Sequence, residues 1–309
     1  MIISVSRRTD IPAYYPDWFI NRIRDGCVYV RNPVNIHQIS KINLNPNVVD
    51  CIVFWSKNPK LMVDKLRYIK EYAYYFQFTL NPYDRDVEVK LPCKGEILET
   101  FKKLSDTIGP QKVIWRYDPV LLNGKYTVSY HIDKFYEFAG KLKGYTGKVT
   151  FSFIDFYKRI AENIKSIGVY ETSIEEKNII ADNFSRAAKE NNLVIDTCAE
   201  GIDLSKYGIA HARCIDDRLI AKITGFNFIA DKDKSQRPEC GCVGSVDIGE
   251  YNSCPNGCVY CYANCSQNIV INNCNKHNPV SPLLVGEINN NDIVNEKKVL
   301  DKTLQKGLF

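Results

Sequence analysis

The chain has 309 residues, of which 45% are hydrophobic, 12% aromatic and 25% charged, a composition that excludes a disordered or fibrous protein. With 41 Lys and Arg against 36 Asp and Glu, the net charge of +5 is too small to indicate nucleic-acid binding, which needs a clustered basic face. The segment before Arg7 is too short for a secretion signal, and no apolar run is long enough to cross a membrane. We therefore expect a cytoplasmic protein without a membrane partner, whose 12 cysteines are reduced or bound to metal.

Short apolar runs rich in β-branched and aromatic residues alternate along the chain with stretches of helical periodicity. The apolar runs predict strands at residues 2–6, 27–31, 51–55, 74–79, 112–117, 148–153, 193–197 and 243–248. The other stretches predict helices at residues 16–24, 59–71, 95–108, 131–142, 173–190 and 215–223. In the fifth of these, Ser173 and Glu176 match the capping-box pattern of a helix start.

This alternation predicts an α/β fold with a parallel sheet, because parallel strands are joined by helical crossovers. Eight strand–helix units predict a complete or partial TIM-like β/α barrel. An open, doubly wound sheet is the alternative, although no glycine-rich dinucleotide-binding turn follows the first predicted strand.

Polar side chains follow several predicted strands, at the end where β/α barrels place their chemistry. For any one of these residues the alternative is an ordinary turn or capping role. In a barrel, these polar side chains would converge on the C-terminal mouth, and charges there would need to be paired. The candidate catalytic residues are Arg7, Arg8, Asp10, Lys57, Arg116 and Asp118.

The composition changes after about Asp231, and seven of the 12 cysteines lie between Cys240 and Cys274. We expect residues 1–235 to form the barrel core and residues 236–309 to form a cysteine-rich segment that completes the same domain. Three cysteines separated by three and then two residues can wrap three thiolates around one inorganic centre and leave one position open. Structural zinc is the alternative on spacing alone. These candidate metal ligands are Cys254, Cys258 and Cys261.

Four further cysteines could form a second, fully ligated cluster if the strand and loop ends that carry them meet. They are Cys198, Cys214, Cys240 and Cys242, and for the first two the alternative is a buried, unliganded thiol. We expect Cys27 and Cys51 to lie in the core, and His131, at the start of a helix, to be a surface or capping residue.

The loop from Cys254 to Cys261, with Tyr260 before its last cysteine, resembles the cysteine loop of radical S-adenosylmethionine enzymes. Over the whole chain, including residues 6–12, 54–59 and 115–119, the sequence resembles a bacterial family known only as a domain of unknown function. That family is noted for a C-terminal cysteine cluster similar to the one in the radical enzymes. Because those enzymes carry the loop after their first strand, the resemblance implies a circularly permuted radical-enzyme barrel.

The resemblance also implies a four-iron, four-sulfur (4Fe–4S) cluster on the three cysteines of this loop, with S-adenosylmethionine at its open iron. Tyr260 would lie near the adenine, and Arg7 and Asp10 are candidates for further contacts with this cofactor. Reduction by a cellular protein such as ferredoxin or flavodoxin would then yield a 5′-deoxyadenosyl radical that acts on a small polar or anionic substrate. Two alternatives stay open: a non-catalytic iron–sulfur electron-transfer or zinc-binding protein, and a nucleic-acid repair enzyme.

Overall fold

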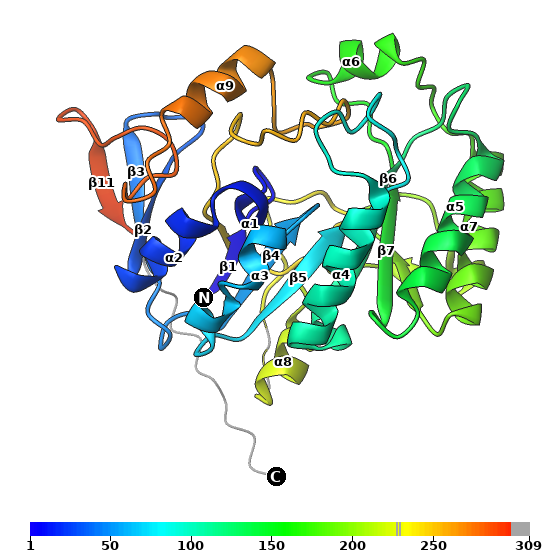
Figure 1. Ribbon diagram of the computed structural model, residues 1–309, viewed down its shortest axis with the longest axis horizontal. Helices are drawn as coiled ribbons and strands as arrows, with labels where there is room; N and C mark the ends of the chain where they lie inside the picture. The colour runs from blue at the N-terminus through cyan, green and yellow to red at the C-terminus, as the bar shows by residue number, and fades with distance from the viewer. Residues whose placement is uncertain (227, 229, 298–309) are drawn as a thin grey trace.

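The computed structural model describes residues 1–226, 228 and 230–297 (Figure 1). Its main sheet has eight strands in the order β10-β1-β4-β5-β6-β7-β8-β9, and every neighbouring pair is parallel. The predicted α/β class and parallel sheet are therefore confirmed. The strands are β1 (Ile2–Val5), β4 (Cys51–Ser56), β5 (Tyr74–Thr79), β6 (Val113–Val120), β7 (Lys148–Phe153), β8 (Val194–Thr197), β9 (Ala210–His211) and β10 (Val246–Asp247).

Each predicted helix has an observed counterpart, although the stretch 59–71 divides into a short α-helix and a 3₁₀ helix, and α1, α6 and α9 were not predicted. Ser173 and Glu176 form the predicted capping box at the start of α7. The α-helices are α1 (Ile11–Tyr14), α2 (Pro16–Arg24), α3 (Lys60–Val63), α4 (Lys94–Ile108), α5 (Val128–Leu142), α6 (Ala161–Ser166), α7 (Ile174–Glu190), α8 (Asp217–Thr224) and α9 (Gln267–Asn275). The 3₁₀ helices are η1 (Leu66–Ile69), η2 (Pro110–Lys112) and η3 (Ser205–Tyr207).

The two faces of the main sheet are buried against different parts of the chain. One face packs on α2, α4, α5 and α7 through large side chains such as Phe54, Phe76 and Trp115. The other face, which includes Val53 and Tyr75, packs on side chains from later in the chain, such as Ala212, Ile220 and Phe228. Burial on both faces explains why the strands read as continuous apolar runs.

The hydrogen-bonded ladder of the main sheet is open, because no strand pairing among the described residues joins β9 to β10. A closed TIM-like barrel is therefore not observed. Irregular backbone spans the gap between these two strands. Val243, shortly before β10, donates its N–H to the carbonyl oxygen of Ile215, shortly after β9, at 3.1 Å. From the middle of the sheet, Tyr75 Oη and Gln77 Nε2 donate to Cys214 O at 2.8 and 2.7 Å.

The predicted strand 27–31 forms, but its place in the parallel sheet was wrong. It is β2 (Cys27–Arg31) of a separate sheet with β3 (Gln38–Asn43) and β11 (Ile293–Glu296), in the order β11-β3-β2. The connection from β2 to β3 is too short for the helical crossover that a parallel pair requires, so the two strands are antiparallel. Cys27 at its start is only half-buried, whereas Cys51 is fully buried as predicted.

The predicted cysteine-rich segment 236–309 supplies β10 to the main sheet and β11 to the small sheet, so it packs against both. Its residues 298–309 lie outside the described part of the chain. No helix in the described part is long and apolar enough to cross a membrane.

Candidate functional site

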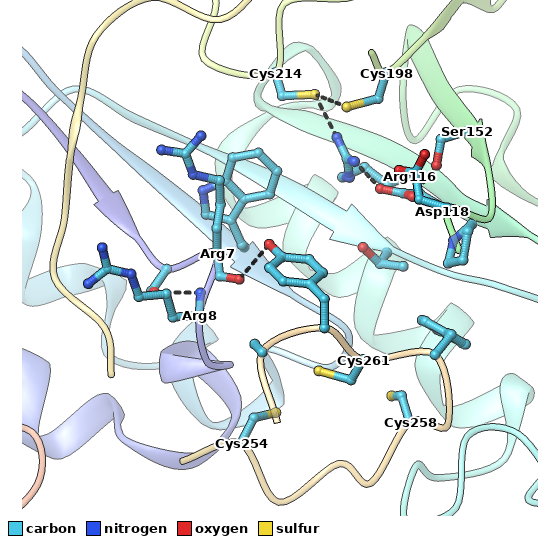
Figure 2. Close-up of a pocket in the computed structure, with 18 of the residues that line it drawn as sticks. Arg7, Arg8, Arg116, Asp118, Ser152, Cys198, Cys214, Cys254, Cys258 and Cys261 are labelled. Atoms are coloured by element: carbon cyan, nitrogen blue, oxygen red, sulfur yellow. Dashed lines mark hydrogen bonds and ion pairs between the residues drawn. The ribbon is translucent and has the colours of Figure 1, made fainter. Parts of the chain in front are cut away.

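A cavity of about 510 Å³ lies at the carboxyl ends of the main-sheet strands (Figure 2). Its walls bring together residues that are far apart in the sequence, including every site residue that the sequence predicted. They are Arg7, Arg8, Asp10, Lys57, Arg116, Asp118, Cys198, Cys214, Cys240, Cys242, Cys254, Cys258, Tyr260 and Cys261.

Residues 254–261, called the cysteine loop below, follow β10 and are fixed by backbone hydrogen bonds to the segment after β5. Val259 N–H donates to Val87 O at 2.9 Å, and Lys90 N–H donates to Asn256 O at 3.1 Å. Gly257 has φ +67°, a left-handed conformation that favours glycine. The loop is therefore held by the segment that follows β5.

The three cysteines of the loop all line the cavity, and Figure 2 shows their side chains turned toward a common space. Burial raises the pKa of the Cys254 thiol to about 12, and it raises the pKa values of Cys258 and Cys261 as well. Neighbouring thiols of the loop raise the Cys254 and Cys258 values further, whereas Lys57 lowers that of Cys258. Buried thiols of this kind become thiolates when a metal replaces their protons.

Within the described residues, no group of three or more His, Cys, Asp or Glu side chains could hold a metal ion as it stands. A cluster differs from a single ion in this respect, because each thiolate binds a different iron and the sulfurs do not need to surround one point. The three thiols of the cysteine loop fit such a cluster by residue type, spacing and common orientation.

Glu88 is a buried site residue that the sequence analysis missed. Its carboxylate accepts hydrogen bonds from Lys57 Nζ at 2.8 Å, from Lys94 Nζ and from the Tyr260 hydroxyl. Burial raises the pKa of Glu88, but the two lysines outweigh that effect and hold it below its ordinary value. The alternation of Val87 and Val89 with charged residues could have indicated an extended segment with Glu88 on its polar side.

Tyr260 is fixed by the same group of residues. Its hydroxyl accepts hydrogen bonds from Lys57 Nζ at 2.6 Å and from Asn81 Nδ2 at 3.0 Å while it donates to Glu88. Its ring lies 5.9 Å from the ring of Tyr83. We call Lys57, Asn81, Glu88, Lys94 and Tyr260 the lysine–glutamate network.

Asp10 joins three parts of the site by accepting hydrogen bonds. Its carboxylate caps α1 through Ala13 N–H at 3.1 Å and accepts from Ser56 Oγ at 2.6 Å and Lys57 N–H at 2.8 Å. Asn256 Nδ2 of the cysteine loop donates to it at 3.3 Å. Burial raises the pKa of Asp10, and these hydrogen bonds offset only part of the rise. Asp10 therefore connects the loops after β1 and β4 to the cysteine loop.

Arg7 and Arg8 face Asp247, a second residue that the sequence analysis missed because it lies inside a predicted strand. Asp247 accepts from Ser6 Oγ at 2.5 Å and from Arg7 N–H at 2.8 Å. The guanidinium contacts are longer: Arg7 Nε and Arg8 Nε lie 3.9 and 4.0 Å from this carboxylate. Arg7 Nη2 also donates to Ser245 Oγ at 3.5 Å and Arg8 Nη1 donates to Gly249 O at 3.3 Å, which leaves further N–H donors on both guanidinium groups.

Arg116 and Asp118, both within β6, form an ion pair in which the arginine is buried. Arg116 is 5% exposed, and its Nη1 donates to Cys214 Sγ at 2.7 Å while its Nη2 donates to Asp118. Ser152 Oγ also donates to Asp118. Burial raises the pKa of Asp118, but Arg116 and Ser152 outweigh it, so the pKa lies below its ordinary value. Arg116 and Asp118 are therefore paired with each other at the cavity.

The expectation that His131 is a surface or capping residue was wrong. His131 is fully buried, and its ring nitrogens contact Tyr117 Oη and Leu121 O at 2.8 Å each. The helix begins at Val128 with Thr127 as its cap, so His131 lies one turn inside, on the face toward the sheet. Burial lowers its pKa to about 4, which keeps the imidazole neutral.

The fold and the cavity define the class: an α/β protein with a polar, thiol-lined cavity at the carboxyl ends of a parallel sheet. The model of a family described as a domain of unknown function (DUF1848) matches residues 2–263. The chain belongs to this family, and the matched range contains every predicted site residue. No curated protein matches the chain.

Proposed function

We propose that this protein is an iron–sulfur enzyme of the radical S-adenosylmethionine type that acts on a small polar or anionic substrate. The observation that carries the proposal is the common orientation of Cys254, Cys258 and Cys261 at one end of a polar cavity. These three residues would hold a 4Fe–4S cluster. When bound, such a cluster supplies one-electron reductive cleavage of S-adenosylmethionine, which leads to abstraction of a substrate hydrogen atom.

The position of the cysteine loop supports the proposal. The radical enzymes carry this loop after their first strand, whereas here it follows β10, late in the chain. β10 pairs in parallel with β1, so the loop lies beside the start of the strand series rather than far from it. We therefore propose an incomplete, circularly permuted barrel in which β10 takes the place of the first strand.

The remaining residues have separate tasks in this proposal. Lys57, Asn81 and Glu88 of the lysine–glutamate network fix Tyr260 within the cysteine loop, and Lys57 offsets negative charge there. Asp10 has four hydrogen-bond donors from the protein, so its task is to position the loop rather than to exchange a proton with a ligand.

Arg7 and Arg8 are the groups that we assign to the anionic part of the substrate or cofactor. Their guanidinium contacts with Asp247 are 3.9 and 4.0 Å long, so donor capacity is left, whereas Arg116 is engaged by Asp118 and Cys214. A reductant such as ferredoxin or flavodoxin and a cytoplasmic location belong to the same proposal, since all 12 cysteines are free thiols that a reducing compartment maintains.

The test is anaerobic reconstitution with iron and sulfide, followed by dithionite reduction in the presence of S-adenosylmethionine. We expect formation of 5′-deoxyadenosine by the unsubstituted chain. Cys258→Ala should lose the iron of the cysteine loop and the product, whereas the matched control Cys51→Ala, a fully buried thiol remote from the cavity wall, should keep both.

Two results would contradict the proposal in different ways. Equal iron content in Cys258→Ala and Cys51→Ala would remove the cysteine loop as a ligand. A stable cluster that forms no 5′-deoxyadenosine would leave an iron–sulfur protein of the electron-transfer type. Salt-sensitive DNA binding would instead favour nucleic-acid repair.

A further inference from the structure

A second group of thiols lines the same cavity away from the cysteine loop, and the proposed function does not use it. Cys198 follows β8, Cys214 follows β9, and Cys240 and Cys242 precede β10. Figure 2 shows Cys198 and Cys214 beyond Arg116, with the cysteine loop on the other side of the view. We call these four residues the four-cysteine cluster.

The four-cysteine cluster brings together cysteines from three separate segments of the chain. Cys214 Sγ lies 3.4 Å from Cys198 Sγ. Cys242 Sγ accepts a hydrogen bond at 3.4 Å from the N–H of Ile215, the residue after Cys214, and Cys240 lies two positions before Cys242. All four line the same cavity.

Close backbone packing fixes the position of residues 240–242 against the segment that carries Cys214. Gly241 lies between two of the cysteines, and a Cβ atom there would be 2.8 Å from Ala212 O and 3.0 Å from Arg213 Cγ. Residues 240–242 are therefore pressed against the segment that carries Cys214. Only glycine permits this approach without a backbone shift.

Hydrogen-bond donors to two of the sulfur atoms complete the site. Arg116 Nη1 donates to Cys214 Sγ at 2.7 Å, and Ile215 N–H donates to Cys242 Sγ at 3.4 Å. Four thiolates around a divalent ion carry two excess negative charges, so a buried guanidinium and a backbone N–H next to the sulfurs would stabilise them. Arg116 is 5% exposed and also pairs with Asp118, so it contacts the cluster through Nη1 alone.

We propose that Cys198, Cys214, Cys240 and Cys242 bind one thiophilic divalent ion, of which zinc is the type, in tetrahedral geometry. Zinc–sulfur bonds of about 2.3 Å in a tetrahedron place the sulfurs about 3.8 Å apart. The separation of 3.4 Å between Cys214 and Cys198 is close to that value. Thiolates on different irons of a cluster do not approach one another so closely, so the contact favours a single ion.

The ion would also have a structural consequence. The cluster lies where irregular backbone spans the gap between β9 and β10, so one ion would fasten the two edges of the main sheet. In the described part of the chain, the four thiols of the cluster do not surround one point at which a metal ion could bind. Binding requires them to turn about χ1, the single heavy-atom rotation of a cysteine side chain.

The test uses the full chain with Cys254, Cys258 and Cys261 all replaced by serine, which removes the centre of the proposed function. After reconstitution with zinc and removal of weakly bound metal, we expect about one zinc per chain. Adding Cys242→Ser should abolish this stoichiometric binding, whereas adding Cys93→Ser, an exposed cysteine outside the cavity, should leave it unchanged.

Cobalt substitution gives a second readout that does not depend on the added variants. In the triple variant, Co²⁺ should give the ligand-field and sulfur charge-transfer bands of a tetrahedral tetrathiolate site. A folded triple variant that binds neither zinc nor cobalt would overturn the proposal. Stoichiometric iron and acid-labile sulfide in place of a single ion would overturn it as well. Neither result bears on 5′-deoxyadenosine formation by the unsubstituted chain.

Discussion

Glu88 and Glu137 show how burial changes the contribution that the same kind of ion pair makes to stability. Each contacts two lysines, Glu88 after β5 and Glu137 on α5. The Glu88 side chain is 1% exposed and that of Glu137 is 35% exposed. Removing one partner of a buried pair leaves charge without compensation, whereas an exposed pair is screened by water.

We expect Glu88→Gln to lower the free energy of unfolding by about 3 kcal/mol, because Lys57 and Lys94 lose their buried counter-charge. The matched control Glu137→Gln should cost less than about 1 kcal/mol. Urea denaturation followed by circular dichroism measures both values. Similar losses for the two variants would show that the lysine–glutamate network is not held together by charge.

Glu250 predicts a dependence of stability on pH. Burial raises its pKa from 4.5 to about 7, despite the opposing effects of Arg8 and Arg31. Between these two values the unfolded chain has released the proton and the folded chain still holds it, so stability falls as pH rises through this window. The loss is complete above pH 7.

Glu250→Gln removes this titration, so the variant should gain roughly 2 kcal/mol relative to the unsubstituted chain on going from pH 5 to pH 8. Urea midpoints at the two pH values provide the measurement, and Glu71→Gln, an exposed glutamate, serves as control. A difference between Glu250→Gln and the unsubstituted chain that stays constant with pH would contradict the assignment.

At the residue scale, the sequence pointed to cavity residues where a charged side chain lies at or just after the end of a predicted strand. Arg7 and Lys57 follow β1 and β4, Arg116 lies in β6, and the structure places all three at the cavity. Glu88 was missed because it lies nine residues beyond the end of β5, and it joins the site only through pairing with the cysteine loop. That pairing joins segments about 170 residues apart in the chain, a distance over which local patterns carry no information.

At the scale of elements, the approach of residues 240–242 to the segment after β9 is the feature most open to a test. A Cβ on Gly241 would collide with backbone, whereas a Cβ on Gly244 would meet Asp231 O only at 4.0 Å. Gly241→Ala should therefore lower the free energy of unfolding by about 2 kcal/mol, since overpacking forces the backbone to shift.

Gly244→Ala is the matched control for this element, and it should change stability by less than about 0.5 kcal/mol. Thermal denaturation of the two variants compares them directly. If Gly244→Ala were the more damaging of the two, the packing of residues 240–242 against Ala212 would not be what holds this segment.

The elements themselves were predicted well where strands are buried on both faces, as for β5 and β7, whose bounds agree with the sequence pattern. β2 was placed in the wrong sheet because its own residues look the same in either environment. The deciding information lies in β3 and in β11, which pairs with β3 from more than 250 residues away along the chain. Which strand meets which depends on tertiary packing rather than on local preference.

At the scale of the whole molecule, the open ladder sets a gradient of local stability across the main sheet. β5 and β6 have hydrogen-bonded neighbours on both sides and are covered on both faces, whereas β9 and β10 are two-residue strands at the edges. The gap between those edges is spanned by single hydrogen bonds such as Val243 N–H to Ile215 O. Regions with few such bonds open locally without global unfolding.

Amide hydrogen exchange should reveal this gradient. We expect peptides around Phe76 and Phe78 to exchange only through global opening, and peptides around Val243 to exchange about 100-fold faster in the metal-free chain. Zinc should slow exchange around Val243 and Ile215, because an ion on the four-cysteine cluster joins the two edges, while β5 should be unaffected. Slow exchange around Val243 without metal would mean that the irregular backbone closes the ring by itself, and the ion would then have no part in joining the edges.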